Sequence, residues 1–135
     1  MFTKKEDVVL FSSVRGKILY KGEPVAHAKV IRRYKYDTQN FLEDSCIASE
    51  KGEFLFPLID RKNTSTTPLV QFVVYQQIFV VRDGVEQQIW GHGKMETSVN
   101  SEYGGEFKEI VCELTREPDN IKVGIVDYVY TSCTW

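Results

Sequence analysis

Hydrophobic and polar residues alternate with a period of two along most of the chain, which is the pattern of β-strands that bury one face. Residues 14–20 follow this pattern, with Ile18 on the inward parity. Gly22 and Pro24 then form a turn, because glycine tolerates a positive φ and proline donates no ladder hydrogen bond. We therefore expect a hairpin whose second strand runs through residues 26–36.

The second strand of this hairpin has one basic parity and one apolar or aromatic parity. The basic side chains face solvent in this interpretation. The inward set consists of Ala28, Val30, Tyr34 and Tyr36. Arg32 interrupts the inward set, so we expect a bulge or the end of the strand near this residue.

Residues 46–59 repeat the turn-and-strand pattern. The turn lies at residues 50–52, where Gly52 lets the chain reverse. The inward residues after the turn are Phe54, Phe56 and Leu58. Pro57 indicates that this segment is an edge strand or ends there, because proline cannot donate to a ladder. A polar connection at residues 60–68 follows.

The longest apolar stretch begins at residue 69, and both of its parities are apolar over residues 69–81. We expect a strand that is covered on both faces, at least in part. Asp83-Gly84 then predicts a two-residue hairpin, with the return strand at residues 85–90. Residues 91–106 hold four glycines, so we expect a loop there with one helical turn near Met95.

Residues 107–114 alternate again, with Ile110, Cys112 and Leu114 inward. A last strand region runs over residues 121–135. Turn signals recur every 8–12 residues or so, which is typical of an antiparallel sandwich. The pattern therefore predicts an all-β fold, a seven- to eight-stranded antiparallel β-sandwich.

The composition fits one globular domain. The chain has 135 residues, of which 42% are hydrophobic, enough for a sizeable core. No linker, repeat or low-complexity block divides it. We expect a single domain over residues 8–135, with a flexible N-terminus at residues 1–7.

Charge and hydropathy bound the partners and the location. The formal net charge of −2 gives no reason to expect a nucleic acid or an anionic membrane as partner. The first apolar run, VVLF, is shorter than the roughly 7–15 residues of a signal-peptide core. No stretch approaches the roughly 20 apolar residues of a membrane span. We expect a soluble cytoplasmic protein without membrane insertion.

The order of the first strands and turns has a known counterpart. The segments VRGKILYKGEPVAHAKV and SEKGEFLFPLI, between Val14 and Ile59, resemble the carboxypeptidase regulatory-like, or transthyretin-like, β-sandwich. The chain departs from that pattern at Ser49, where the family more often has aspartate before the turn. Serine can also cap a turn. The resemblance implies a transthyretin-like sandwich.

The second half of the chain carries a narrower resemblance. Trp90, Lys94 and residues 112–115 are similar to features of a family of small uncharacterised bacterial proteins with a transthyretin-like first half. Members of that family look like accessory proteins of bacterial secretion and competition loci. The resemblance implies an immunity or accessory protein that binds a toxin, an effector or a secretion-system component.

The titratable residues favour no catalytic site. Transthyretin-like enzymes that hydrolyse hydroxyisourate end in Tyr-Arg-Gly-Ser and use several histidines, whereas this chain ends in TSCTW and has only His27 and His92. Neither histidine has another histidine or a cysteine within five residues, so we expect no metal site. There is no phosphate-binding loop or dinucleotide fingerprint. We expect no cofactor and no enzymatic activity.

The three cysteines, Cys46, Cys112 and Cys133, are an odd number at wide spacing, which is neither a disulfide framework nor a zinc motif. We interpret them as small apolar residues in a reducing compartment. Pairing of Cys112 with Cys133 stays open, and it requires that the last two strands be neighbours.

Protein binding is the function that the remaining residues favour. Seven tyrosines and two tryptophans exceed the needs of a small core, and such residues are enriched at protein interfaces. Residues 32–44 and 89–105 are the candidate surfaces. The candidate partner-binding residues are Arg33, Tyr34, Tyr36, Phe41, Trp90, His92 and Tyr103.

Self-association is the alternative function. Exposed edge strands can pair between two copies of a chain and so form a homodimer. Residues 123–130, VGIVDYVY, are a candidate edge. The sequence is compatible with a monomer or a homodimer, and light scattering distinguishes the two.

Overall fold

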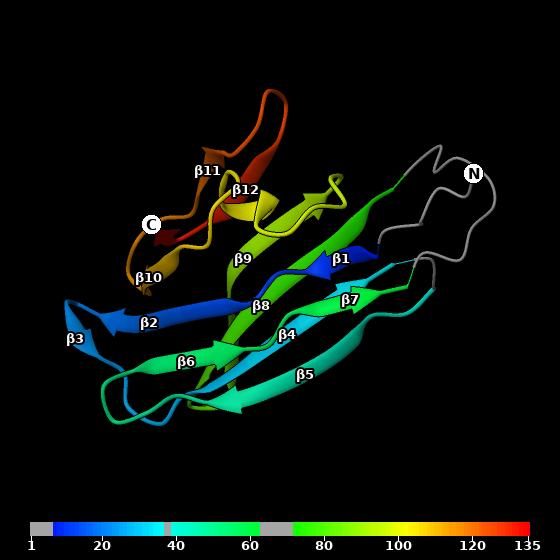
Figure 1. The fold of residues 1–135 in the computed structure, drawn as a ribbon. Helices are drawn as coiled ribbons and strands as arrows, with labels where there is room; N and C mark the ends of the chain where they lie inside the picture. The colour runs from blue at the N-terminus through cyan, green and yellow to red at the C-terminus, as the bar shows by residue number, and fades with distance from the viewer. Residues whose placement is uncertain (1–6, 37–38, 63–71) are drawn as a thin grey trace, which may run out of the picture.

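A computed structural model gives the fold of the protein, and the strands lie in two main layers (Figure 1). The structure describes residues 7–36, 39–62 and 72–135. Most of the expected flexible N-terminus and the expected strand start at residues 69–71 lie outside the described residues. The described chain is nearly all β, with one short 3₁₀ turn, η1 (Ser101–Tyr103).

The larger layer is a six-stranded antiparallel sheet with the order β11-β12-β9-β8-β4-β5. In that order the strands are β11 (Asp119–Lys122), β12 (Tyr128–Thr131), β9 (Val85–Lys94), β8 (Val74–Arg82), β4 (Lys29–Lys35) and β5 (Leu42–Ile47). The strand expected as an edge at residues 123–130 is not one, because β12 pairs with β11 on one side and β9 on the other.

The second layer is built around β2, which pairs with three other strands. Its five strands are β2 (Val14–Tyr20), β3 (Glu23–Pro24), β6 (Glu53–Phe56), β10 (Glu109–Glu113) and β13 (Cys133–Thr134). Beside it, β1 (Val8–Phe11) and β7 (Ile59–Arg61) form a two-stranded ladder.

The fold class is as predicted, an all-β fold with mostly antiparallel pairing. One pair departs from the prediction, because β10 runs parallel to β2, with Ile110 beside Gly16. The described residues form thirteen strand segments, and three of them have only two or three residues. Short interruptions such as Pro57 and Leu58, between β6 and β7, account for a number above the predicted seven or eight.

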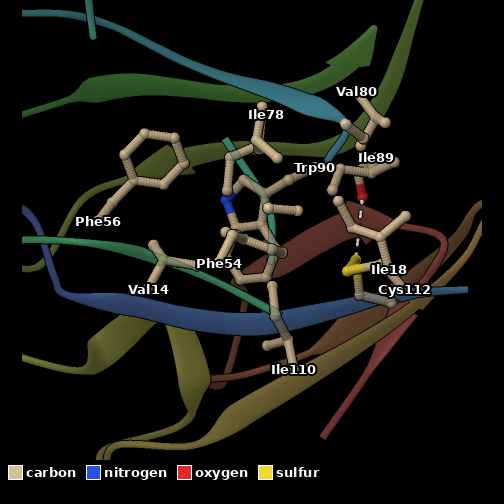
Figure 2. Packing of buried hydrophobic residues seen from close by; sticks show 14 of the residues in the cluster. Val14, Ile18, Phe54, Phe56, Ile78, Val80, Ile89, Trp90, Ile110 and Cys112 are labelled. Carbon is tan, nitrogen blue, oxygen red and sulfur yellow. Dashed lines mark hydrogen bonds between the residues drawn. A yellow bond between two sulfur atoms is a disulfide. The ribbon is translucent and has the colours of Figure 1, made fainter. Parts of the chain in front are cut away.

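The main hydrophobic core lies between the two larger sheets (Figure 2). The six-stranded sheet contributes Ile78, Val80 and Trp90, each at most 1% exposed. The five-stranded sheet contributes Val14, Ile18, Phe54, Phe56 and Ile110. The predicted inward positions Ile18, Phe54, Phe56 and Ile110 are therefore confirmed, whereas Trp90 is buried although it was expected on a contact surface. Leu58 is an exception, because it follows the end of β6 and is 37% exposed.

Two predicted turns are confirmed in their local chemistry. Asp83 and Gly84 join β8 to β9 with φ of 51° and 76°, the left-handed values that a tight two-residue hairpin requires. Ser49 caps the turn before β6, where its Oγ accepts hydrogen bonds from the backbone N–H groups of Lys51 and Glu53, both at 3.2 Å.

Arg32 is fully buried inside a continuous strand, so the bulge or strand end expected there is wrong. Its guanidinium lies between the rings of Phe11 and Phe56, at 5.0 and 4.8 Å from their centroids. Arg32 donates to both carboxylate oxygens of Asp44, at 2.9 and 2.6 Å, and to the carbonyl of Pro57 at 2.7 Å. Aromatic faces and a bidentate carboxylate together compensate the burial of this charge.

β9 is longer than expected. It continues through Gly91, His92 and Gly93 to Lys94, so these residues are not in a loop. The helical turn expected near Met95 forms later, at η1. Glycines on the exposed parity of a strand produced the loop-like composition that misled the prediction.

Cys112 and Cys133 form a disulfide between the neighbouring strands β10 and β13. The pairing that the sequence left open is therefore present, and the interpretation of all three cysteines as free thiols is wrong. Cys46, on β5, is a free thiol, and burial is the main cause of its raised pKa. A raised thiol pKa makes Cys46 less reactive than an exposed cysteine.

Candidate functional site

Three of the seven candidate partner-binding residues lie in the interior. Trp90 is 1% exposed, Tyr103 is 5% exposed and His92 is 9% exposed. The Trp90 ring packs against Tyr103 at 5.9 Å and against Trp135 at 5.5 Å between centroids. Their expected place on a contact surface is wrong, because the three side chains project from their backbone toward the core.

Tyr34 on β4 and Tyr36, just after the end of β4, are half-buried and pack against the hydrophobic core. The Tyr36 ring packs against Phe72 at 5.1 Å, and the Arg61 guanidinium lies 5.2 Å from its centroid. Only Arg33 and Phe41 of the candidate set lie with the outer face of the six-stranded sheet. The structure therefore does not bring the seven residues together in one surface.

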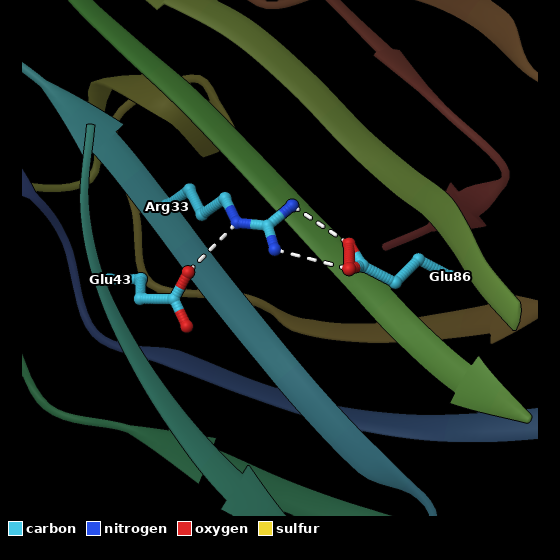
Figure 3. A network of polar contacts seen from close by, with 3 residues as sticks. All are labelled: Arg33, Glu43 and Glu86. Carbon is cyan, nitrogen blue, oxygen red and sulfur yellow. Dashed lines mark hydrogen bonds and ion pairs between the residues drawn. The ribbon is translucent and has the colours of Figure 1, made fainter. Parts of the chain in front are cut away.

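Arg33 on β4 is held by two carboxylates, Glu43 on the neighbouring strand β5 and Glu86 on β9, one strand beyond β8 (Figure 3). Its Nε donates to Glu43 at 3.1 Å, and its two terminal nitrogens donate to Glu86 at 2.8 and 3.1 Å. The hydrogen bonds to Glu86 and Glu43 raise the pKa of Arg33, and the same bond to Arg33 lowers the pKa of Glu86. The guanidinium also lies 4.7 Å from the Phe79 centroid. This cation is thus already neutralised within the sheet.

A polar network on the inner face of the sheet surrounds Glu102, which is 1% exposed. The Glu102 carboxylate accepts hydrogen bonds from the Ser12 N–H at 2.8 Å, the Ser12 hydroxyl at 2.7 Å and the Gln76 amide at 3.0 Å. The Gln76 oxygen accepts from the Trp90 indole at 3.2 Å. Each buried group has a partner inside the protein, so the network stabilises the core and offers no group to a substrate.

His92 and Lys94 lie at the C-terminal end of β9, and both side chains are on the inner face of the sheet. Lys94 is fully buried, and its Nζ donates to the carbonyls of Glu96 and Ser98 and to the Ser101 hydroxyl. Burial lowers the pKa of Lys94 and also that of His92. The His92 Nδ1 lies 2.9 Å from the Tyr128 carbonyl, to which it donates. Both side chains therefore brace the loop and strand around them rather than face solvent.

The outer face of the same sheet carries exposed aromatic side chains. Tyr75 is 52% exposed, and Tyr128 and Tyr130 are each 50% exposed. They flank a shallow groove of about 300 Å³, which we call the tyrosine groove. Its lining includes Phe41, Tyr75, Gln88, Gly93, Tyr128 and Tyr130.

The register of five strands creates a symmetric row across this groove. Lys35 on β4 pairs with Tyr75 on β8, and Tyr75 pairs with Gly93 on β9. The register of β12 on β9, continued by one residue, places Tyr128 beside Gly93, and Tyr128 pairs with Lys122 on β11. We call these five residues the central row: a glycine between two tyrosines, with a lysine beyond each tyrosine.

Gly93 forms the open floor of the groove. Its φ is not in the left-handed region, and a Cβ built on it would meet only a Val73 methyl carbon, at 3.8 Å. Gly91, the next outward residue on β9, differs, because its Cβ would lie 2.8 Å from the Gln88 amide nitrogen. Within the described residues, therefore, neither backbone geometry nor packing requires a glycine at position 93.

Sequence reasoning missed the central row almost entirely. Tyr75 lay on a parity that was expected to be partly covered, and Tyr128 in a run that was expected to be an edge. The only available signal was the GHG segment, where two glycines alternate with an inward histidine at strand spacing. The row itself depends on the register of strands that are up to 87 residues apart, between Lys35 and Lys122.

A second hollow, of about 520 Å³, lies between residues 96–105 and 123–127. The Glu96 and Asp127 carboxylates and backbone groups line it. Ile125 and Val126, at the turn between β11 and β12, are 91% and 73% exposed. This hollow lacks a row of aromatic side chains, so we regard the tyrosine groove as the better candidate site.

Metal and membrane sites have little support in the described part of the chain. Among those residues, histidines, cysteines and carboxylates form no group of three or more that could hold a metal ion. None of the described helical structure has the length and hydrophobicity of a membrane-spanning helix. His27 is exposed in the turn before β4, away from other ligand types.

Residues 14–117 match the protein family described as Domain of unknown function (DUF6795). This match covers well over half of the chain. No curated protein and no solved structure matches the chain. The description of the family names no activity.

Proposed function

Since the chain belongs to the DUF6795 family, we propose that it is a non-enzymatic binding module that holds a protein partner in the tyrosine groove. Tyrosine suits such a role because its ring offers apolar contact area and its hydroxyl can form a hydrogen bond. Interface energy concentrates at tyrosine, tryptophan and arginine anchors near the centre of a contact. The groove presents three half-exposed tyrosines around one point.

The open glycine at the centre of the groove carries this proposal. A glycine inside a strand weakens it, and it commonly marks a place where a ligand or another backbone approaches closely. Gly93 has no other requirement for glycine among the described residues. A partner that packs against the β9 backbone between Tyr75 and Tyr128 accounts for it.

An immunity or accessory role is the biological setting that we propose, with a toxin, an effector or a secretion-system component as the partner. A transthyretin-like sandwich is the fold family that we propose. The resemblances of residues 14–59 and of Trp90, Lys94 and residues 112–115 support both. The buried, fully bonded state of Glu102 supports a role without catalysis, because its carboxylate is closed to substrates.

The cytoplasm is the location that we propose, and the cysteines make it testable. Disulfides are rare in a reducing cytoplasm. Cells should therefore be quenched in acid and the protein denatured before alkylation, because Cys112 and Cys133 are buried in the folded protein. All three cysteines should then be modified if the protein resides in the cytoplasm. Modification of Cys46 alone would place the chain in an oxidising compartment, with the Cys112–Cys133 bond formed as in the structure.

Self-association is the second candidate function. The strand β5 is at one end of the six-stranded sheet, and Leu42 and Ile47 on it are 52% and 62% exposed. An edge strand with exposed apolar residues can pair through its open side with its copy in a second chain. Light scattering across a range of concentrations tests this, and a stable dimer would favour self-association over a monomeric binding module.

Co-purification from the native cell tests the proposed function. The variant Tyr75→Ala/Tyr128→Ala removes both rings of the central row, and Tyr20→Ala removes an exposed tyrosine of the other sheet as a control. We expect one protein partner to co-purify with the wild type and with Tyr20→Ala. Its recovery should fall by at least about thirtyfold with the double variant, since two anchor residues are worth about 2 kcal/mol or more. Equal recovery with the double variant, or no protein partner at all, would contradict the proposal.

A further inference from the structure

We propose that the central row binds an extended acidic segment of the partner, with one proline or apolar side chain over Gly93 and carboxylates at Lys35 and Lys122. This inference rests on the proposed function and names the chemistry of the partner at the same site. The register places the two lysines at opposite ends of the row, outside the two tyrosines.

Charge complementarity is the first argument for an acidic ligand. In the described part of the chain, neither Lys35 nor Lys122 forms an ion pair with a carboxylate. The acidic side chains on the outer face of β5 and β9, Glu43 and Glu86, are both bound to Arg33. The face therefore presents two uncompensated cations, and an incoming carboxylate need not displace an existing partner.

The position of the Lys35 ammonium supports the same conclusion. It lies 5.3 Å from the centroid of Phe41 and 5.3 Å from that of Tyr75. Contact with two aromatic faces holds a flexible lysine beside the groove and reduces the entropy lost when it binds an anion. The cation is thus placed directly beside one of the two tyrosines that flank Gly93.

The spacing of the row sets the length of the segment. Neighbouring strands lie about 4.8 Å apart, so four spacings put the Lys35 and Lys122 backbones about 19 Å apart. An extended chain advances about 3.3 Å per residue, so about six residues cover this distance. The partner segment should have acidic residues at both ends of a stretch of about seven residues and an apolar or proline residue near its centre.

The shape of the floor favours a peptide over an acidic polysaccharide. The open floor is a single residue, Gly93, and the Gln88 amide covers the next outward glycine, Gly91, while it donates to the Trp90 carbonyl at 3.0 Å. A peptide that crosses the sheet can place one side chain or one proline in such a space. A sugar chain that stacks successive rings along the groove needs both glycine positions open.

Peptide pools test this inference directly. The first pool has glutamate at both ends of seven residues, proline or leucine at the centre and mixed residues elsewhere. Two matched pools replace both glutamates with glutamine or with lysine. We expect the acidic pool to shift the amide NMR signals of Tyr75, Gly93 and Tyr128. We expect the glutamine pool to bind about tenfold more weakly, since it lacks both ion pairs with the lysines and exposed ion pairs are individually weak.

Two variants sharpen the test. Lys35→Glu/Lys122→Glu should reverse the preference, so that the lysine pool binds more tightly than the acidic pool. Gly93→Val should weaken the binding of every pool, because its methyl groups fill the floor of the groove. Binding by the acidic pool should also fall as salt rises, because the lysines are solvent-exposed or partly so.

The results separate this inference from the proposed function. Equal binding of the three pools, or no binding by any of them, would overturn the proposal that the partner segment is acidic. Binding of polygalacturonate, an acidic polysaccharide, without binding of the acidic pool would overturn the proposal that the ligand is a peptide. In each of these cases the proposed function stands if Tyr75→Ala/Tyr128→Ala still loses the co-purified partner, and it fails if that variant retains the partner.

Discussion

The two faces of the six-stranded sheet use the same kinds of side chain in opposite ways. Arg32 and Arg33 are consecutive on β4, yet Arg32 is fully buried between two rings, whereas Arg33 lies on the outer face. On β9, Trp90 packs in the core, while the tyrosines that border the same strand on the outer face are half exposed. Residue type therefore does not tell whether a side chain stabilises the core or is available for contact. The face of the sheet on which the side chain lies does.

The two faces also differ in how their polar groups are satisfied. On the inner face, Glu102, Lys94 and Arg32 are each surrounded by donors or acceptors within the protein. On the outer face, Lys35 and Lys122 have no carboxylate partner among the described residues. A buried polar group must be satisfied internally, whereas an exposed one remains free for a partner.

Replacement of the two neighbouring arginines should give the largest contrast. Arg32→Ala removes a buried cation and leaves the Asp44 carboxylate and the Pro57 carbonyl without it, so we expect a loss of about 3–5 kcal/mol in the free energy of unfolding. Arg33→Ala should cost less than about 1 kcal/mol, because its ion pairs are exposed. Urea unfolding measures both, and similar losses would contradict the division between the faces.

Two glutamates provide a second contrast. Glu102→Ala leaves the buried Ser12 N–H without its acceptor and the Gln76 amide with only the Leu10 carbonyl, and we expect a loss of about 2–4 kcal/mol. Glu86→Ala on the outer face should leave stability almost unchanged, because its ion pair with Arg33 is exposed. The same unfolding experiment applies. A stable Glu102→Ala protein would show that the network is not needed for the core.

Two strand glycines should respond oppositely to alanine. A Cβ at Gly16 would lie 2.6 Å from the Phe54 ring and 2.9 Å from Ile110, so Gly16→Ala should cost about 1–3 kcal/mol through overpacking. Gly93→Ala should leave stability unchanged or raise it by about 0.5–1 kcal/mol, since glycine weakens a strand interior. Thermal unfolding of both variants measures this, and a destabilised Gly93→Ala protein would mean that the position has an internal role.

The smallest of these effects should be the change in the free energy of unfolding with pH that comes from His92 on the inner face. Burial lowers the pKa of His92 below its ordinary value. In the unfolded chain His92 titrates near pH 6.5, so between the two pKa values the unfolded state binds more protons. The stability is therefore fully present above about pH 6.5 and is lost as the pH falls through the lowered folded pKa.

Two histidine variants check this pH dependence. His92→Gln should flatten the loss of stability between pH 7.5 and 5, as measured by urea midpoints. His27→Asn, at the exposed turn histidine, should leave the profile as it is, and asparagine tolerates the positive φ of 59° at that position. A profile that changes with His27→Asn but not with His92→Gln would contradict the buried assignment.

The strands and turns were predictable from local signals. The parity of Phe54 and Phe56 and the Asp83-Gly84 hairpin were correct, because alternation and turn chemistry depend on residues adjacent in sequence. The burial of Arg32 was not predictable in this way. Its compensation comes from Phe11, Phe56 and Asp44, which local sequence does not reveal as neighbours.

The candidate site was harder to predict than the fold. The glycines around His92 and Tyr103 indicated a loop over residues 91–106, whereas Gly91 and Gly93 lie on the solvent face of β9. The central row requires the register of five strands, and no local pattern encodes that register. Composition indicated an aromatic surface, but only the sheet order showed which aromatics form it.

Gly93→Val is the sharpest probe of partner binding at the tyrosine groove, because it fills the groove without disturbing the core. The decisive measurement is the recovery of the co-purified partner with this variant relative to the wild type, at matched expression and with the melting temperature recorded. We predict a melting temperature at or above that of the wild type and a recovery reduced at least about tenfold, which corresponds to about 1.4 kcal/mol of binding free energy. Full recovery of the partner with the well-folded variant would contradict the assignment of binding to this face.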